Sequence, residues 1–252
     1  MALTRPPLRL LLLGGTREAR ELAGRLADDR RWSVISSLAG RTRAPEALVG
    51  DVRVGGFGGV DGLAGYLASN DVDIIIDATH PFAEAISQNA FNAARQTGRP
   101  YLRLCRPSWQ PEAGDHWLPA RDVQHAAALL EPGCKVLLTI GRQELAPFLQ
   151  RSDIRIVARM IEAPSEAVPL HVEIILARPP FNVADEVALI RDRRFDVMVT
   201  KNAGGCSVEA KLTAARELGL SVIMIQRPPH APPAAAQSVD DVCRLLDQHY
   251  AI

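Results

Sequence analysis

Two glycines separate the first apolar run of the chain from a charged stretch. Residues 10–13 are all leucine, Gly14-Gly15-Thr16 follows them, and Arg17 opens the charged segment. This order predicts a buried strand that turns on the glycines into the start of a helix. Backbone N–H groups and the positive end of a helix dipole bind phosphate at such a turn. The predicted cofactor ligands are therefore Gly14, Gly15, Thr16 and Arg17. The alternative is that the glycines only allow the chain to turn.

The match to the dinucleotide fingerprint G-x-G-x-x-G/A is partial, because Gly14 and Ala19 fit its outer positions while Thr16 stands in the middle. Cofactor choice depends on the next strand, expected over residues 32–38, since NAD sites carry a carboxylate at its end. Here serines, a glycine and arginines stand at that end, and they would accept a 2′-phosphate. The sequence therefore favours NADP. The predicted ligands in this segment are Ser37, Gly40, Arg41, Thr42 and Arg43.

The strand expected near residues 73–77 ends in Asp77-Ala78-Thr79-His80-Pro81-Phe82-Ala83, in which Asp77 is expected to brace the turn. Ligands of parallel α/β sheets bind beyond the carboxyl ends of the strands. Pro81 keeps His80 extended and outside the following helix. His80 could contact the nicotinamide, bind a substrate carboxylate or move a proton, the alternative being a hydrogen bond to the loop backbone. The predicted cofactor ligands here are Thr79, His80 and Phe82.

Two further strand ends carry cations in the second half of the chain. Lys201 ends an apolar strand and precedes Gly204-Gly205, so it is expected to serve as an anion clamp or a proton donor rather than as a surface lysine. Arg142 follows Gly141 after the strand at residues 135–139, where a helix-face salt bridge is the alternative to substrate binding. The two halves also echo each other weakly around these turns.

Composition excludes several classes of protein. The 252 residues are 47% hydrophobic and leave one or two domains open, and the 29 basic and 29 acidic residues balance. The chain has no global field for nucleic acid or an anionic membrane, and no apolar run approaches the ~20 residues of a membrane span. The four cysteines form no C-x-x-C pair, which argues against a zinc site or a disulfide scaffold. We expect a soluble, cytoplasmic protein without bound metal, and a monomer is compatible with the sequence.

Apolar strands alternate with amphipathic helices along the whole chain, which predicts an α/β fold with parallel strands. A turn-rich segment at residues 106–115 interrupts the alternation and marks the domain boundary. Residues 1–106 are predicted to form the NADP-binding domain and residues 107–252 the substrate-side domain. The terminal helix expected at residues 239–249 is free to pack on either half. The expected strands are residues 8–13, 33–38, 52–54, 73–77, 101–104, 135–139, 155–160, 173–177, 196–200 and 221–226.

Together the motifs resemble the precorrin-6A reductase family of cobalamin biosynthesis, over the chain from about Leu8 to Pro228. They are the segments at residues 14–20, 77–83, 101–109, 137–142 and 200–205, with Lys211. The resemblance implies two Rossmann-like domains, each a mainly parallel sheet flanked by helices, with the active site between them. It also implies NADPH-dependent reduction of a carbon–carbon double bond of precorrin-6A to give precorrin-6B. The sequence departs from the family's pattern at residues 178–181, which leaves Phe181 without an assigned role.

The substrate that the resemblance implies carries acetate and propionate groups, which arginine and lysine side chains would bind. Lys201 and His80 are the predicted catalytic residues. No flavin, metal or covalent nucleophile is required. The predicted substrate ligands are Arg103, Arg106, Gly141, Arg142, Lys201, Asn202, Gly204 and Gly205.

Other functions stay open on the sequence. No tyrosine is followed by a lysine four residues later, and the hydrolase, metalloprotease and P-loop motifs are absent. The alternatives are a non-catalytic NADP-binding regulator and a reductase of another acidic substrate, including the cobalt-containing precorrin. A methyltransferase-like protein is disfavoured by the arginines after the second strand.

Overall fold

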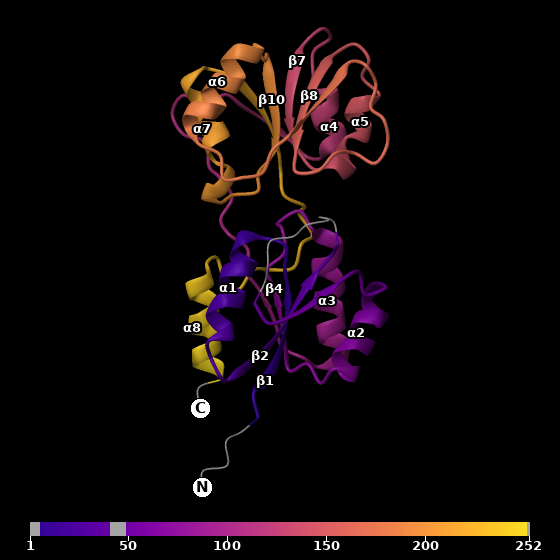
Figure 1. Ribbon diagram of the computed structural model, residues 1–252, viewed down its shortest axis with the longest axis vertical. Helices are drawn as coiled ribbons and strands as arrows, with labels where there is room; N and C mark the ends of the chain where they lie inside the picture. Colours follow the sequence, from indigo (N-terminus) through magenta and orange to yellow (C-terminus); the bar gives the residue numbers. More distant parts are fainter. Residues whose placement is uncertain (1–5, 41–48, 251–252) are drawn as a thin grey trace. The chain divides into compact units, whose positions relative to one another are not determined.

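The computed structural model describes residues 6–40 and 49–250, which divide into two compact units. Unit 1 comprises the described residues up to Arg106 together with those from Pro229 onward, and unit 2 is Pro107–Pro228 (Figure 1). Each unit is a parallel sheet flanked by helices, so the predicted α/β class with two sheets is confirmed. The prediction that the active site lies between the domains concerns their relative placement and stays a prediction.

The sheet of unit 1 has the strand order β3-β2-β1-β4-β5, and every pairing in it is parallel. Helices α1 and α8 cover one face and α2 and α3 the other (Figure 1). The elements are β1 (Leu8–Leu13), α1 (Arg17–Ala27), β2 (Trp32–Leu38), β3 (Asp51–Val54), α2 (Gly59–Ser69), β4 (Ile74–Asp77), α3 (Glu84–Thr97), β5 (Tyr101–Arg103) and α8 (Val239–His249).

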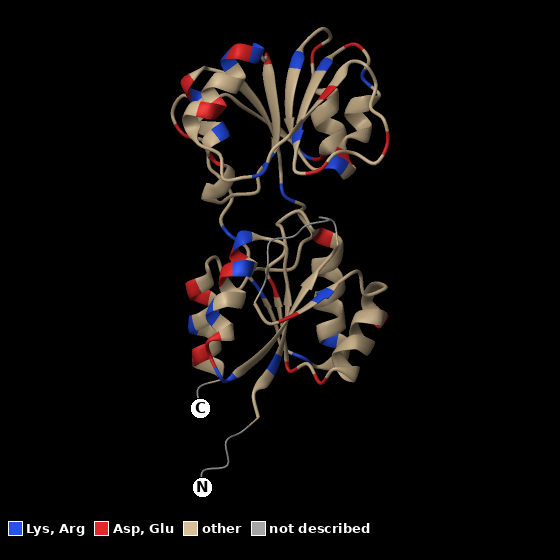
Figure 2. Cartoon of the chain, in the orientation of Figure 1, with Lys and Arg blue, Asp and Glu red and all other residues tan. Residues whose placement is uncertain are grey.

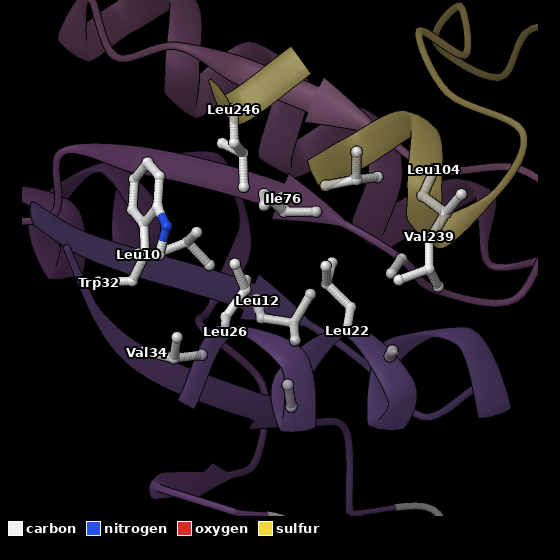
Figure 3. Close-up of a cluster of buried hydrophobic side chains, with 14 of the residues drawn as sticks. Leu10, Leu12, Leu22, Leu26, Trp32, Val34, Ile76, Leu104, Val239 and Leu246 are labelled. Carbon is white, nitrogen blue, oxygen red and sulfur yellow. The ribbon is translucent and has the colours of Figure 1, made fainter. Parts of the chain in front are cut away.

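The core of unit 1 follows the two-residue period of its strands. Leu10 and Leu12 point to the face that α1 and α8 cover, whereas Leu11 and Leu13 point to the opposite face. Figure 3 shows Leu10 and Leu12 among side chains of α1 and α8. Because both faces are covered by helices, the central strand is apolar throughout, as parallel sheets require.

The C-terminal segment corrects the predicted domain limits. The boundary after Arg106 agrees with the division of the chain, but the described residues from Pro229 onward belong to unit 1 and not to the second domain. Val239, Val242 and Leu246 form an apolar stripe on α8 that is buried in the core of unit 1. Before the helix, the backbone N–H of Ala236 donates to Arg103 O at 3.1 Å. An apolar stripe demands a partner, but its pattern does not say which sheet supplies it.

The sheet of unit 2 has the order β6-β11-β10-β7-β8-β9, again with parallel pairing. Strand β6 was not expected from the sequence. It is a short edge strand that contains Pro119 and the half-exposed Leu118, and edge strands tolerate proline and lack an apolar run. The elements are β6 (Trp117–Ala120), α4 (Val123–Ala128), β7 (Lys135–Thr139), η1 (Arg142–Glu144), α5 (Ala146–Leu149), β8 (Arg155–Met160), β9 (Val172–Leu176), α6 (Val183–Arg193), β10 (Val197–Lys201), η2 (Cys206–Val208), α7 (Ala210–Glu217) and β11 (Ser221–Ile225).

Acidic and basic residues are interspersed on the helices of both units (Figure 2), in keeping with the balanced total charge. No helix in the part of the chain that the structure describes is long and apolar enough to cross a membrane. Because the total charges balance, the binding of an anion depends on local groups, either cationic side chains or backbone N–H groups.

Candidate functional site

The direction in which strands are added reverses between β1 and β4 in unit 1. From β1 the chain adds β2 and β3 on one side, and β4 with β5 lies on the other. Ligands of such sheets bind at this reversal, beyond the carboxyl ends of the two strands. The two motifs predicted to bind the cofactor follow these strands. A small pocket opens there, lined by Thr16, Glu18, Ala78, Thr79, Pro81, Leu104, Cys105 and Arg106.

The turn after β1 has free space around Gly15 and is followed by a helix whose N-terminus is capped by Thr16. Gly15 has φ 108°, and no heavy atom lies within 4 Å of a Cβ added to it. Thr16 is the N-cap of α1: its hydroxyl accepts a hydrogen bond from Ala19 N at 3.1 Å and donates to Ala78 O at 2.7 Å. The Thr16 side chain therefore joins the turn to the loop after β4. The predicted binding of phosphate at Gly15, Thr16 and the first helical residue, Arg17, would use backbone N–H groups and stays a prediction.

Asp77 braces the loop after β4, as predicted. The fully buried carboxylate accepts hydrogen bonds from Thr79 N at 3.0 Å, Thr79 Oγ1 at 2.7 Å and the Tyr101 hydroxyl at 2.8 Å. Burial, followed by the negative charge of Asp77, raises the pKa of Tyr101 far above its usual range, so the phenol stays neutral. The Thr79 hydroxyl is thereby committed to the loop, which leaves its predicted contact with the cofactor to other atoms.

Arg103 also belongs to this network, and its predicted role as a substrate ligand stays a prediction. Its side chain is only 7% exposed, Nε lies 3.7 Å from Asp77 Oδ2, and Nη1 donates to Pro232 O. Moving a buried guanidinium away from the buried carboxylate that it neutralises is unfavourable, because the carboxylate would be left as an uncompensated charge. Arg103 therefore holds β4, β5 and the returning C-terminal segment together.

His80 makes the loop contact that was the alternative to a functional role. Its Nδ1 accepts a hydrogen bond from Phe82 N at 3.3 Å, and the two rings lie 5.8 Å apart. An accepting Nδ1 places the proton of the neutral ring on Nε2. The loop bond therefore orients the ring and selects its tautomer, while the predicted catalytic and cofactor roles of His80 stay predictions.

Arg53, which the sequence analysis missed, contacts one of the predicted cofactor ligands. It lies on β3 opposite Ser37 of β2, and its Nη1 donates to Ser37 Oγ at 3.1 Å. The guanidinium carbon stacks 3.7 Å from the centre of the Phe57 ring. Gly40 has φ 72° just beyond the strand, whereas Arg41, Thr42 and Arg43 lie outside the described residues. Pairing of residues 37 and 53 depends on strand register, which the sequence does not state.

Unit 2 repeats the arrangement of unit 1. Its strand order reverses between β7 and β10, where Thr139 pairs with Thr200. The segments that carry Gly141 and Arg142 and the motif that begins at Lys201 therefore meet at one edge of the sheet. The structure thus brings together two sets of predicted substrate ligands that lie some 60 residues apart.

The cations at these edges carry glutamate partners that the sequence analysis did not identify. Lys201 Nζ forms an ion pair with Glu144, whose other carboxylate oxygen accepts from Gly141 N at 3.3 Å. Arg142 Nη1 lies 3.3 Å from Glu162 Oε2. In unit 1, Arg106 Nη1 lies 2.8 Å from Glu18 Oε2, and both residues line the small pocket.

Asn202 and Gly204 both have structural contacts with the backbone, and their predicted roles as substrate ligands stay predictions. The buried Asn202 amide accepts from Trp109 N at 2.8 Å and donates to Trp109 O at 3.1 Å. A Cβ added at Gly204, which has φ 68°, would lie 1.9 Å from Pro107 O. Both residues hold the chain where it enters unit 2. Gly205, with φ 85°, caps η2 and keeps its predicted role as a prediction.

Among the described residues, no group of three or more His, Cys, Asp or Glu side chains is placed to hold a metal ion. The chemistry that these sites support is the binding of anions: phosphates at the turn of unit 1, and carboxylates at the cationic edge of unit 2.

Comparison with known proteins agrees with this arrangement. A family model described as precorrin-6x reductase CbiJ/CobK matches residues 9–248. A precorrin-6A reductase of Rhodococcus erythropolis is 52% identical over 93% of this chain and 94% of its own length. A cobalt-precorrin-6A reductase of Priestia megaterium is 34% identical over 87% of this chain and 90% of its own.

A solved structure described as CobK precorrin-6A reductase superposes with a TM-score of 0.89 at 41% identity, covering 97% of this chain and 98% of that chain. The matches assign the chain to cobalamin biosynthesis as an oxidoreductase that acts on a CH–CH group. The chain therefore belongs to the precorrin-6x reductase CbiJ/CobK family.

Proposed function

We propose that this chain uses NADPH to reduce one carbon–carbon double bond of precorrin-6A, giving precorrin-6B. The observation that carries the choice of cofactor is the end of β2. Ser37 stands there beside the Arg53 guanidinium, in the place where an NAD site has a carboxylate. A carboxylate would repel a 2′-phosphate, whereas a hydroxyl next to a cation accepts it.

The residues of unit 1 fit a dinucleotide. The backbone at Gly15 is open, the N-terminus of α1 begins two residues later, and the pocket lies at the reversal of strand order. When bound, NADPH supplies the hydride. The chain's own residues would bind the pyrophosphate with the N–H groups of the turn and orient the nicotinamide beside His80 and Phe82.

The cations of unit 2 would bind the acetate and propionate groups of the macrocycle. Lys201 and Arg142 each already hold a glutamate, so a substrate carboxylate would replace or share a partner of the same charge. Such an exchange requires less free energy than desolvating a fully hydrated ammonium or guanidinium, because the side chain in the ion pair is already partly desolvated. Arg106, paired with Glu18, offers the same chemistry in unit 1.

Reduction of a conjugated double bond requires a proton in addition to the hydride. Lys201 would meet this need as an ammonium held by Glu144, whereas a neutral His80 ring that accepts from Phe82 N would orient a ligand through its Nε2–H rather than release that proton. We assign the proton to Lys201, because it lies at the edge of unit 2 that carries the other predicted substrate ligands.

We further propose that the substrate is the metal-free ring. The Rhodococcus relative, named for precorrin-6A, is 52% identical, whereas the Priestia relative, named for cobalt-precorrin-6A, is 34% identical. We place the enzyme in the cytoplasm as a monomer. None of its four cysteines, all within the described residues, forms a disulfide, as is usual in reducing compartments.

The test is an anaerobic assay of the purified chain with NADPH and precorrin-6A, followed through the absorbance of both. We expect stoichiometric oxidation of NADPH with formation of precorrin-6B, and a lower kcat/KM with cobalt-precorrin-6A. Binding of NADPH without oxidation in the presence of the ring would instead identify a non-catalytic regulator. A preference for the cobalt complex would overturn the choice of substrate alone.

A further inference from the structure

A buried polar cluster lies on the α6 and α7 side of the sheet in unit 2. We define it by five residues at the carboxyl ends of β7, β8 and β10 and on the two helices. Its strand residues share a face with Leu137, Val157 and Met198, which pack against α6 and α7. The members are Thr139, Arg159, Glu186, Thr200 and Lys211.

Lys211 is the unusual member of this buried polar cluster. The residue is only 6% exposed, and its Nζ donates to Thr139 Oγ1 at 3.1 Å. The Trp109 ring centre lies 5.7 Å from Nζ. Within the described residues, no carboxylate lies within ion-pairing distance of Lys211. The acidic member of the cluster, Glu186, pairs instead with Arg159, with Oε1 and Nη1 2.5 Å apart. The cluster therefore holds two basic side chains and one acid.

Burial and the neighbouring Arg159 together oppose the protonation of Lys211. The pKa of Lys211 is lowered to about 7. Burial is the largest cause and the positive charge of Arg159 the second, whereas the negative charge of Glu186 acts in the opposite direction. Lys211 therefore changes between ammonium and neutral amine near neutral pH.

Thr139 connects Lys211 to the edge that carries the substrate ligands. Its hydroxyl lies 3.2 Å from Val199 O and so joins β7 to β10. Thr139 is the last residue of β7, two positions before Gly141, and its register partner Thr200 directly precedes Lys201. Lys211 is thus hydrogen-bonded to the last residue of the strand that leads to Gly141 and Arg142, and the register partner of that residue leads to Lys201.

We infer that Lys211 is a positioning residue whose protonation is linked to the binding of the polycarboxylate substrate at this edge. The inference rests on the proposed function of unit 2. Substrate carboxylates stabilise the ammonium form of Lys211, and the ammonium form in turn strengthens their binding, as linkage requires. Substrate binding therefore takes up protons near neutral pH, and the KM for the ring rises as pH increases through the titration of Lys211.

The test compares Lys211→Met, which keeps the volume and removes the titration, with Lys211→Arg, which keeps the charge at all pH values. Lys135→Met is the matched control, because Lys135 lies at the opposite end of β7 and donates to Arg193 O. In wild type and the control, we expect the KM for precorrin-6A to rise about fivefold or more between pH 6 and pH 9. In Lys211→Met this rise disappears, while the KM for NADPH is unchanged.

Calorimetry gives a readout that needs no turnover. Titration of the wild type with uroporphyrin III, an octacarboxylate ring, in buffers of different ionisation enthalpy should detect proton uptake at pH 7 that is lost in Lys211→Met and Lys211→Arg. Proton uptake that persists in these variants overturns the inference. If Lys211→Met fails to fold, as circular dichroism would reveal, Lys211→Arg and Thr139→Val decide. A wild type that binds the porphyrin with proton uptake but never oxidises NADPH contradicts the proposed function alone.

Discussion

Single residues of this chain separate into those that hold the backbone and those left to bind ligands. Asp77, Arg103 and Asn202 stand in motifs that resemble a reductase family, yet their polar atoms are spent on buried contacts within one unit. Arg53 lies outside these motifs and does both: its guanidinium donates to the predicted cofactor ligand Ser37 and also to Gly55 O at 2.7 Å and Gly56 O at 2.8 Å. Motif membership therefore does not separate structural from ligand-binding roles.

Arg53→Gln tests the 2′-phosphate site. Loss of a charge-assisted contact costs ~1.5–3 kcal/mol, so the Kd for NADPH should rise roughly ten- to a hundredfold while that for NADH stays nearly constant. The measurement is fluorescence titration with both cofactors. Arg95→Gln is the control, because the Arg95 guanidinium lies over the Phe91 ring on α3. Equal weakening of both cofactors would show that Arg53 only supports the backbone.

Lys201→Ala tests the substrate edge. NADPH affinity should match the wild type, whereas kcat/KM for precorrin-6A should fall, because loss of a carboxylate contact raises KM and loss of the proposed proton donor lowers kcat. Removal of a proton donor lowers kcat by ~10²–10⁴-fold. Steady-state kinetics at several pH values make the measurement. Wild-type kinetics throughout would place the substrate cations elsewhere.

At the scale of elements, both sheets place their motifs at the reversal of strand order. In each unit the two central strands are neighbours that run parallel, so their carboxyl ends open at one edge. In unit 2, this edge also receives the chain at Pro107 and Trp109, which Gly204 and Asn202 hold. The loop after β10 thus has a structural task next to its proposed functional one.

Gly204→Ala tests that structural task. The added Cβ would collide with Pro107 O, so the free energy of unfolding should fall by more than about 3 kcal/mol. Gly219→Ala is the matched control, since Gly219 has φ 64° with no atom within 4 Å of an added Cβ. Its cost is that of a left-handed backbone alone, ~1–2 kcal/mol. Urea unfolding followed by tryptophan fluorescence distinguishes the two, and equal losses would contradict the close approach.

At the scale of the whole molecule, the chain builds two cores and closes the first with its last helix. Unit 1 cannot be completed before α8 has been made, because Val239, Val242 and Leu246 are part of its core. The stability of unit 2, in turn, includes the cost of burying the Lys211 side chain, with its pKa lowered to about 7.

Stability should therefore depend on pH through Lys211. Its pKa is about 7 in the folded chain and ~10.4 when unfolded, so between these values the unfolded state binds more protons and stability rises with pH. Below pH 7 the full penalty applies. Lys211→Met should therefore stabilise unit 2 most at pH 6, by up to a few kcal/mol, and least above pH 10. Denaturant unfolding across this range measures the difference, and a pH-independent difference would refute the lowered pKa.

The α/β class, the boundary after Arg106 and the family could be predicted without coordinates, because strand periodicity, turn glycines and short motifs are local properties of the chain. Only the three-dimensional fold shows which motif residues lie next to each other and which use their polar atoms in hydrogen bonds to the backbone. Ion pairs such as Asp77 with Arg103 and Lys201 with Glu144 join residues that are distant along the chain, and strand register pairs Ser37 with Arg53. The same holds for the sheet that α8 covers. An apolar stripe predicts that the helix is buried, but it does not predict which of the two sheets it packs against.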